Sequence, residues 1–376
     1  MNRTASSFLY LGSFVAFAAL AIVSGCAHQN TQPLITPVAI SPPEQIGYVG
    51  AEKCAPCHAA EFDIQSKTHH ALTLRHATRK ELGPLSPPIG RVGDAPYVVA
   101  EEKGEFVFAS ADEAAGAAPF QYAFGSGIAN ITFIGQIDAN RITEFRMSYN
   151  PGEKRWYTTP GQETSEDLSI GRAHAAGIAR RCIHCHSGAR AADRLAPQEG
   201  LLGVQCESCH GPGAAHIEAA SLNSRPKDLK ILNPGHMSAH GVNEVCGDCH
   251  RTTRDIPLQG LDTVNTGRFQ PYAIENSPCY RKSGDAISCI TCHDAHKDAS
   301  TDLKHYEAIC LSCHSSKAGP PAKACPVNAT EKCIGCHMPQ RRVLPGTHIP
   351  LTMTDHLIWA YRPEKGSGGS HKTAAR

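Results

Sequence analysis

Residues 204–216 read VQCESCHGPGAAH, a stretch in which two cysteines stand three positions apart and a histidine directly follows the second. A further histidine, His216, comes six positions later. The same C-x-x-C-H spacing occurs seven times in the 376 residues and uses fourteen of the seventeen cysteines. In chain order, motifs 1 to 7 are Cys54-Cys57-His58, Cys182-Cys185-His186, Cys206-Cys209-His210, Cys246-Cys249-His250, Cys289-Cys292-His293, Cys310-Cys313-His314 and Cys333-Cys336-His337.

This motif is the attachment signature of a c-type haem. Its two thiols form thioether bonds with the vinyl groups, and the adjacent histidine then lies under the iron as the proximal ligand. Zinc knuckles also use C-x-x-C, but zinc coordination does not require a histidine directly after each pair. Disulfides do not account for that histidine either. The sequence therefore predicts seven covalently attached haem c groups, with metal knuckles or disulfides as the alternative.

Six of the motifs lie close together along the chain, which predicts the fold class. Between residues 171 and 362 the first cysteines of successive motifs are 21 (Cys289 to Cys310) to 43 (Cys246 to Cys289) positions apart. Spacers of this length are too short to give each haem its own protein core. We predict a mainly α and irregular multihaem cytochrome c fold with a core of stacked haems, wrapped by short helices and loops.

The first residues are typical of an export signal. A basic start at Arg3 precedes an apolar run from Phe8 to Val23, which ends in Ser24-Gly25-Cys26. The run is too short for a membrane span, and small residues follow it. The site resembles the lipobox of bacterial lipoproteins, in which the cysteine is acylated; an ordinary signal peptide is the alternative. Because Ala27 rather than Asp follows Cys26, we expect the periplasmic or cell-surface face of the outer membrane.

Composition divides the chain into six predicted segments. These are a lipoprotein signal peptide (1–25), a flexible tether (26–47), a first haem segment (48–90), a β-rich insert (91–170), a six-haem region (171–362) and a disordered tail (363–376). The insert has no Cys or His, and its Phe145, Met147 and Tyr149 alternate with polar residues, which predicts a half-buried strand in a small antiparallel sheet. In the first haem segment, residues 59–79 contain few helix breakers and predict one helix.

The sixth ligands must come from the fourteen histidines outside the motifs. With only five methionines in the chain, bis-histidine ligation is favoured. His296 follows His293 within about 10 Å of chain, too short a reach to round its own macrocycle, so we expect it to serve a neighbouring iron. The turn at residues 211–213 directs His216 to a neighbour in the same way. The candidate distal ligands are His69, His70, His174, His216, His236, His296, His348 and His356, with His240 as an alternative to His236.

Two cysteines after the signal region belong to no motif. Because an exported protein folds in an oxidising compartment, Cys279 and Cys325 are predicted to form a disulfide. Unpaired thiols are the alternative.

The motifs and their order resemble multihaem cytochromes c of the cytochrome c-554-like group. The similar stretches are YVGAEKCAPCH followed by HHALTLRHA, then KRWYTTPG, CESCHGPGAAH, SPCYRKSGDAISCITCHDAH, and CIGCHMP with TDHLIW. The resemblance implies stacked and perpendicular haem pairs. It also implies that His69 or His70, His216, His296 and His356 are distal ligands. The haem number and the β insert depart from the four-haem members of the group.

These features predict an electron carrier rather than an enzyme. The formal net charge is +1, but seven haems bring fourteen propionates, so the mature holoprotein is acidic and a basic nucleic-acid surface is not expected. We expect electron transfer along bis-histidine haems at a membrane surface, with a quinol-linked donor, a terminal reductase or other cytochromes as partners. One alternative is a reductase or oxidase of a small nitrogen or sulfur compound at a five-coordinate haem. The other is a subunit of a polymeric cytochrome filament.

Overall fold

The computed structural model describes residues 47–85, 91–92, 95–110, 117–138, 141–163, 170–187, 200–222, 227–256, 265–315, 325–328, 330–344, 347, 349 and 351–360. The predicted signal peptide, nearly all of the tether and the predicted tail lie outside these residues, as do Cys26 and His348. The described residues form a mixed fold of antiparallel sheets and short helices, rather than the mainly helical fold predicted. None of the helices in this part of the chain combines the length and apolar character that a membrane span requires.

The segment around motif 1 is not the single helix predicted for residues 59–79. Its elements are η1 (Ala51–Lys53), α1 (Ala59–Gln65), η2 (Ala71–Thr73), β1 (Leu74–His76) and α2 (Arg79–Leu82). The Thr68 hydroxyl donates to the carbonyl of Gln65 at 2.7 Å and accepts from the amide of Ala71 at 3.3 Å, so it stabilises a turn where the helix would continue. β1 then pairs with another strand, and this tertiary pairing overrides the local helix propensity.

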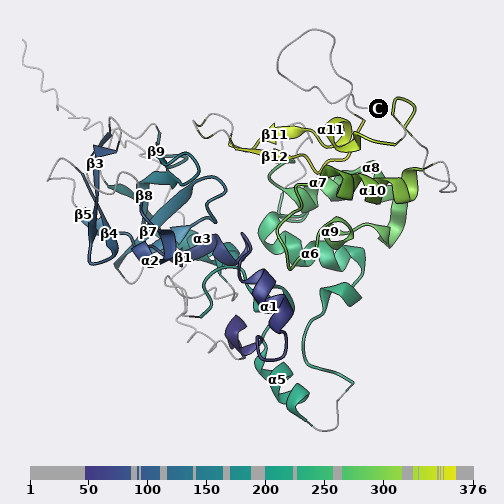
Figure 1. The fold of residues 1–376 in the computed structure, drawn as a ribbon, viewed down its shortest axis with the longest axis horizontal. Coiled ribbons are helices and arrows are strands. Elements are labelled where there is room, and N and C mark those ends of the chain that lie inside the picture. Colours follow the sequence, from purple (N-terminus) through teal and green to yellow (C-terminus); the bar gives the residue numbers. More distant parts are fainter. Residues whose placement is uncertain are drawn as a thin grey trace, which may run out of the picture. The chain divides into compact units, whose positions relative to one another are not determined.

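Strands β1 to β10 form two antiparallel sheets. They span residues 74–175 and so extend beyond the predicted insert of residues 91–170 at both ends. One has the order β1-β6-β7-β8-β10, with β9 paired to β8, and the other has the order β2-β3-β4-β5 (Figure 1). Lys103 and Gly104 form the predicted turn between β3 and β4, both with positive φ, as a tight hairpin turn requires. The strands are β2 (Arg91–Val92), β3 (Ala95–Glu102), β4 (Glu105–Ser110), β5 (Ala117–Pro119), β6 (Tyr122–Phe124), β7 (Ile131–Asp138), β8 (Arg141–Asn150), β9 (Arg155–Thr158) and β10 (Gly171–Ala175).

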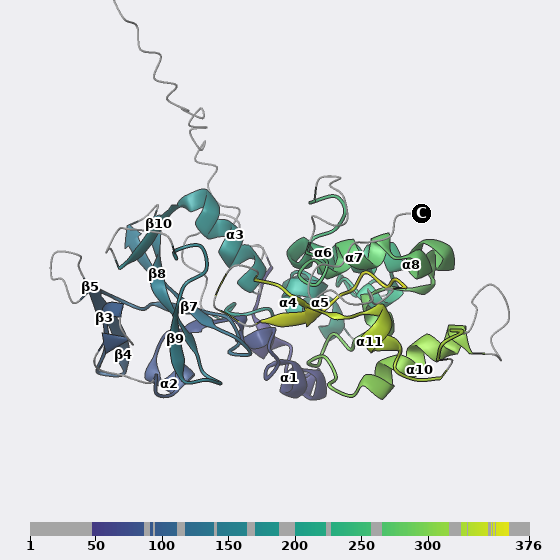
Figure 2. The same ribbon diagram turned by 90° about the horizontal axis from the view of Figure 1, so that it is seen from above.

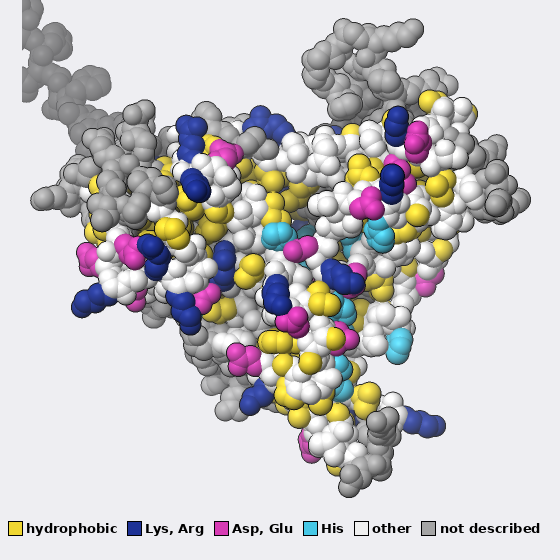
Figure 3. All heavy atoms as spheres, viewed as in Figure 1, with side chains coloured by type: hydrophobic (Ala, Val, Ile, Leu, Met, Phe, Trp, Pro, Cys, Tyr) yellow, Lys and Arg dark blue, Asp and Glu magenta, His cyan; other side chains and the backbone are white. Residues whose placement is uncertain are grey.

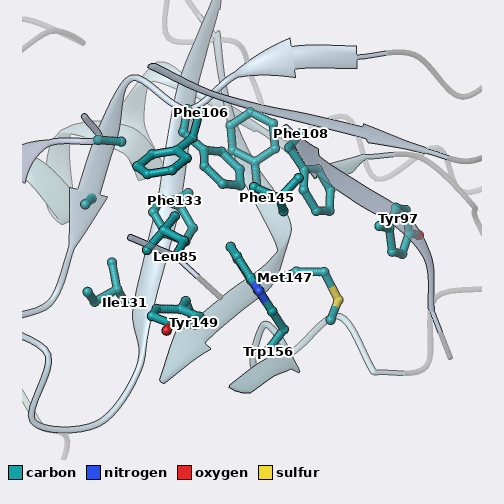
Figure 4. Close-up of a cluster of buried hydrophobic side chains, with 14 residues drawn as sticks. Leu85, Tyr97, Phe106, Phe108, Ile131, Phe133, Phe145, Met147, Tyr149 and Trp156 are labelled. Carbon is teal, nitrogen blue, oxygen red and sulfur yellow. The ribbon is translucent and has the colours of Figure 1, made fainter. Parts of the chain in front are cut away.

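The core of the strand region is built from aromatic side chains (Figure 4). The rings of Phe120 and Phe133 stack with centroids 4.0 Å apart, and Phe145 meets Phe120 edge-on at 4.7 Å. Each fully buried Phe contributes about 2 kcal/mol through removal of its surface from water. Strand β8 is buried on both faces and not half-buried as predicted. The buried hydroxyl of Ser148 is satisfied by the hydroxyls of Thr132 and Thr159 at 2.9 Å each.

The rest of the described chain consists of short helices and one small hairpin (Figure 2). α6 packs against α3, α7 and α9, and α10 packs against α9 and α11. The elements are α3 (Ala176–His186), α4 (Cys206–His210), α5 (Ala214–Ser221), η4 (Pro234–His236), α6 (Ala239–His250), α7 (Gln270–Asn276), α8 (Pro278–Ser283), η6 (Gly284–Ala286), α9 (Cys289–Cys292), α10 (Leu303–His314), α11 (Cys333–His337), β11 (Gln340–Arg342) and β12 (Thr352–Thr354).

Candidate haem-binding sites

Each motif from 2 to 7 lies on a short helix or in its last turn. Residues i, i+3 and i+4 of a helix share one face, so the two thiols and the histidine ring of such a motif point the same way. In motif 3, Gln205 before the first cysteine and Ser208 between the two cysteines form a reciprocal capping box, and Gly211 ends the helix at φ 74°. Ser288 and Thr291 form the same device at motif 5. The sequence next to the cysteines therefore presents each motif as one turn.

Four pairs of histidine rings face each other at almost the same separation. The ring centroids are 6.3 Å apart in His58–His216, 6.1 Å in His70–His250, 6.1 Å in His210–His296 and 6.2 Å in His293–His356. A metal–imidazole nitrogen bond is about 2.0 Å long, so two rings on opposite sides of one iron have centroids about 6 Å apart. Each pair joins one motif histidine to one of the candidate distal histidines. The residues present thus fit an iron between each pair.

The orientation of these rings favours coordination through Nε2. In six histidines of the motifs and pairs, Nδ1 lies within 3.1 Å of an oxygen that accepts its proton, which leaves the Nε2 lone pair free for a metal. The acceptors are the carbonyls of Thr73 for His186, Leu232 for His210, Leu229 for His216, Trp359 for His337 and Thr354 for His356, and Oε1 of Gln270 for His250.

Burial keeps several of these rings neutral. It lowers the pKa of His186 and His293, and it lowers the pKa of His356 to about 4. Since only neutral imidazole binds iron, the environment supports the ligand form near neutral pH.

Other candidate histidines use Nε2 differently. Nε2 of His174 lies 3.0 Å from Oε2 of Glu144, and Nε2 of His69 lies 3.6 Å from Oδ2 of Asp298. His236 is exposed at the end of η4. Of the adjacent residues 69 and 70, only His70 forms one of the four ring pairs, a choice that sequence reasoning left open.

Thiols of different motifs also approach each other. Hydrogen bonds join Cys54 to Cys206, Cys185 to Cys249, and Cys246 to Cys289. Burial and then the nearby Cys246 thiol raise the pKa of Cys209 to about 11. The pKa of Cys310 is raised to about 11, mainly by burial and to a smaller extent by the nearby thiols of Cys333, Cys292 and Cys279. Hydrogen bonds thus link motif 1 to motif 3, motif 2 to motif 4 and motif 4 to motif 5. The electrostatic effects on Cys209 and Cys310 indicate that motif 3 lies near motif 4, and motif 6 near motifs 5 and 7.

Further surroundings of the motifs include a cavity and partly exposed rings. A cavity of about 320 Å³ opens beside motif 5, lined in part by Cys292, His293, His305 and Tyr306. In Figure 3 several histidine side chains, in cyan, reach the surface among hydrophobic and charged groups. The protein therefore leaves open space beside the side chains of motif 5.

Sequence reasoning missed the role of Glu207, which lies between the two cysteines of motif 3. Its carboxylate is buried and accepts the amides of Val49, Gly50 and Gly213 at 2.7 to 3.1 Å. This carboxylate ties the chain before motif 1 to motif 3. A glutamate inside C-x-x-C carries no local signal of such a contact, because its partners come from a distant part of the chain.

The predicted disulfide is absent from the structure, in which Cys279 and Cys325 are both free thiols. Cys279 is half-buried beside the thiols of Cys292 and Cys310, whereas Cys325 lies near Cys333. The two cysteines thus have different motif cysteines as neighbours.

Comparison with known proteins shows that part of this chain is similar to multihaem cytochromes. The family model described as cytochrome c554 and c-prime matches residues 147–211, which contain motifs 2 and 3. The chain is 25% identical over 162 residues to the multiheme cytochrome MtrA of Shewanella baltica (strain OS185), over 40% of this chain and 47% of that protein. It thus spans about half the length of this curated relative.

A solved structure, that of the outer cell wall cytochrome OcwA, aligns with a TM-score of 0.49 and 17% sequence identity, over 83% of this chain and 79% of that one. The family match and the curated relative confirm the resemblance predicted from the motifs.

Proposed function

We propose that this chain, a multihaem c-type cytochrome, carries seven haems and transfers electrons along them at a membrane surface, in periplasmic or extracellular respiration. When bound, haem c supplies a one-electron ferric/ferrous couple whose potential the protein tunes through ligands and burial. The observation that carries the proposal is the set of four facing imidazole pairs. Rings on both sides of an iron leave no position for a substrate, and this favours electron transfer.

The proposed axial ligands connect motifs that are distant in sequence. His216, which follows motif 3, faces the histidine of motif 1, and His296, which follows motif 5, faces that of motif 3. His70 faces motif 4 and His356 faces motif 5. Each of these histidines holds a second segment against the site that it completes. The arrangement supports haems packed closely enough for rapid electron exchange.

The thiol contacts support an order for the haems. Thiol hydrogen bonds join motif 4 to motifs 2 and 5, and its Cys246 thiol is within electrostatic reach of Cys209 of motif 3, so we propose motif 4 as the branch point of the path. Motifs 1, 2 and 7 are then the three ends of the path. Electrons entering at one end have two possible exits, which suits a protein that serves more than one redox partner.

Motif 2 favours a second candidate function, the reduction of a small nitrogen or sulfur compound. Its His186 ring lies 5.0 Å from Phe124, while Nε2 of the nearest predicted ligand in sequence, His174, is bonded to Glu144. The Glu144 carboxylate is also within electrostatic reach of the Cys182 thiol of motif 2, so it would lie near a five-coordinate iron held there. Reductase activity would then be expected at motif 2.

Anchoring and partners follow from the N-terminal sequence and the charge. We propose export, with acylation of Cys26 and tethering through residues 27–46 to the outer membrane. Acidic haem propionates at the surface favour redox partners with complementary positive charge, such as other cytochromes or a terminal reductase.

Intact mass spectrometry and spin-state measurements test these proposals together. We expect seven haem additions and one lipid, low-spin electron paramagnetic resonance signals from at least the four haems of the ring pairs, and no more than three carbon monoxide sites after reduction, because the ring pairs account for motifs 1, 3, 4 and 5. Fewer than seven haem additions would contradict the haem count. High-spin iron at four or more sites would contradict bis-histidine ligation of the paired rings. Turnover of nitrite, hydroxylamine or sulfite would favour the reductase.

A further inference from the structure

We propose that His240, Glu244 and Glu275 form a binding site for a divalent transition-metal cation, separate from the haem sites. His240 and Glu244 are one turn apart on α6, and Glu275 lies in the last turn of α7, which packs against α6. One ligand atom from each of the three side chains lies within 4.8 Å of the other two. Small rotations of the side chains would bring these atoms to coordination distance.

An unsatisfied oxygen supports a ligand at this place. Oε2 of Glu275 accepts from the Thr253 hydroxyl at 3.0 Å and from the Thr253 amide at 3.3 Å. Oε1 of the same carboxylate is buried and has no hydrogen-bond partner among the described residues. A buried carboxylate oxygen without a partner is costly, and a coordinated cation removes that cost.

The charges near the site also favour a cation. Arg254 lies beside the two carboxylates, with its Nη1 2.5 Å from Oε2 of Glu244, whereas Nε of Arg281 donates to the backbone carbonyl of Glu275 at 3.4 Å. The Arg254 side chain is 66% exposed, so it can swing into solvent when a metal binds. A divalent ion would then balance the two carboxylates.

The donor set selects the class of metal. Imidazole is a ligand for zinc, copper, iron and nickel, whereas calcium and magnesium take oxygen donors. One imidazole with two carboxylates matches a zinc-type ion, with water completing its shell. We therefore propose a divalent first-row transition cation, with Zn²⁺ as the redox-inert probe.

A cation at this site would act on a neighbouring haem site. The carboxylate of Glu275 is within electrostatic reach of the Cys289 thiol of motif 5. Added positive charge beside a haem favours its reduced form, so metal binding should raise the potential of the motif 5 haem. This consequence rests on the proposed electron-transfer function, whereas metal binding itself does not.

Equilibrium dialysis of the metal-stripped holoprotein against Zn²⁺, with zinc counted by mass spectrometry, tests the site. We expect one tightly bound Zn²⁺ per chain. Loss of a ligand in Glu275→Gln or His240→Ala should weaken binding by a factor of about 10 to 100 or more. His240 is exposed, so its variant should fold even if that of Glu275 does not. Haem content, measured in parallel, should stay unchanged.

The variant Glu218→Gln serves as a control, because Glu218 is exposed and lies outside the cluster. Unchanged zinc binding in this control, together with its loss in the His240 variant, supports the site. Absence of tight binding to the wild type overturns it, as does equal binding in the wild type and the His240 variant. A Zn²⁺-dependent rise in one haem potential, absent from the His240 variant, would further support the site; bound zinc without such a rise would overturn the electrostatic effect alone.

Discussion

The strand region from β1 to β10 and the motif region from α4 to β12 are held together in different ways. In the strand region, Phe106, Phe108, Phe133 and Phe145 are fully buried in one apolar cluster. In the described part of the motif region, buried apolar side chains are few and none belongs to such a cluster, while half-buried Cys and His face one another. The strand region supplies its own apolar core, and we propose that bound haem supplies the core of the motif region.

Helix length supports the same contrast. α4 and α11 have five residues each and α9 has four, far below the length at which an isolated helix is stable in water. Their stability must come from attachment to a larger group, as in other domains whose folding depends on a bound cofactor. Folding of the motif region is therefore expected to follow haem insertion.

Removal of one haem should have the largest effect and should be confined to the motif region. In the double variant Cys206→Ala/Cys209→Ala, motif 3 loses its thioethers, and both His296 and the α4–α5 segment lose their anchor. We expect a mass lower by one haem and faster hydrogen exchange in residues 206–222 and 47–58. Exchange in β7 and β8 should not change. Equal loss of protection in β7 and β8 would show that the two regions do not fold independently.

The reverse experiment truncates the aromatic core. Phe145→Ala removes a fully buried ring that contacts Phe108 and Phe120, and it should cost about 3–5 kcal/mol of stability in the strand region. Thermal unfolding followed by circular dichroism in the β range should show the loss. Haem content should stay at the wild-type value, and a variant that loses haems would contradict the contrast between the regions.

Loss of the buried carboxylate of Glu207 should have a smaller effect within the motif region. Glu207→Gln replaces a charged acceptor of three amides by a weaker one, at a cost of about 1–3 kcal/mol. Hydrogen exchange of the amides of Val49, Gly50 and Gly213 should accelerate. The exposed Glu218→Gln serves as the control, and equal acceleration there would contradict a specific role of Glu207.

The smallest effect on stability, with the sharpest readout, comes from adjacent histidines. His70→Ala should make the iron of motif 4 high-spin without loss of haem, since His250 would then be its only histidine ligand. His69→Ala should leave the spectrum low-spin, because the His69 ring lies beside Asp298. Electron paramagnetic resonance distinguishes the two variants, and high-spin iron in His69→Ala alone would reverse the ligand choice.

The sequence predicted haem attachment at the motifs and part of the fold. The strand pattern of residues 145–149 and the Lys103-Gly104 turn predicted an antiparallel sheet correctly, because alternation and turn residues are local signals. The helix predicted over residues 59–79 was wrong, because β1 pairs with a strand far along the chain. The burial of both faces of β8 also depends on such distant contacts.

The cysteine and histidine spacing by itself predicts the type of cofactor and its points of attachment, because three neighbouring residues carry out that chemistry within one helical turn. Only the tertiary structure decided which ring faces which, for example His296 opposite His210 and His70 rather than His69 opposite His250. A second ligand can come from any segment that the fold brings within about 6 Å of the first. No local pattern encodes that approach, since it depends on how the intervening segments pack.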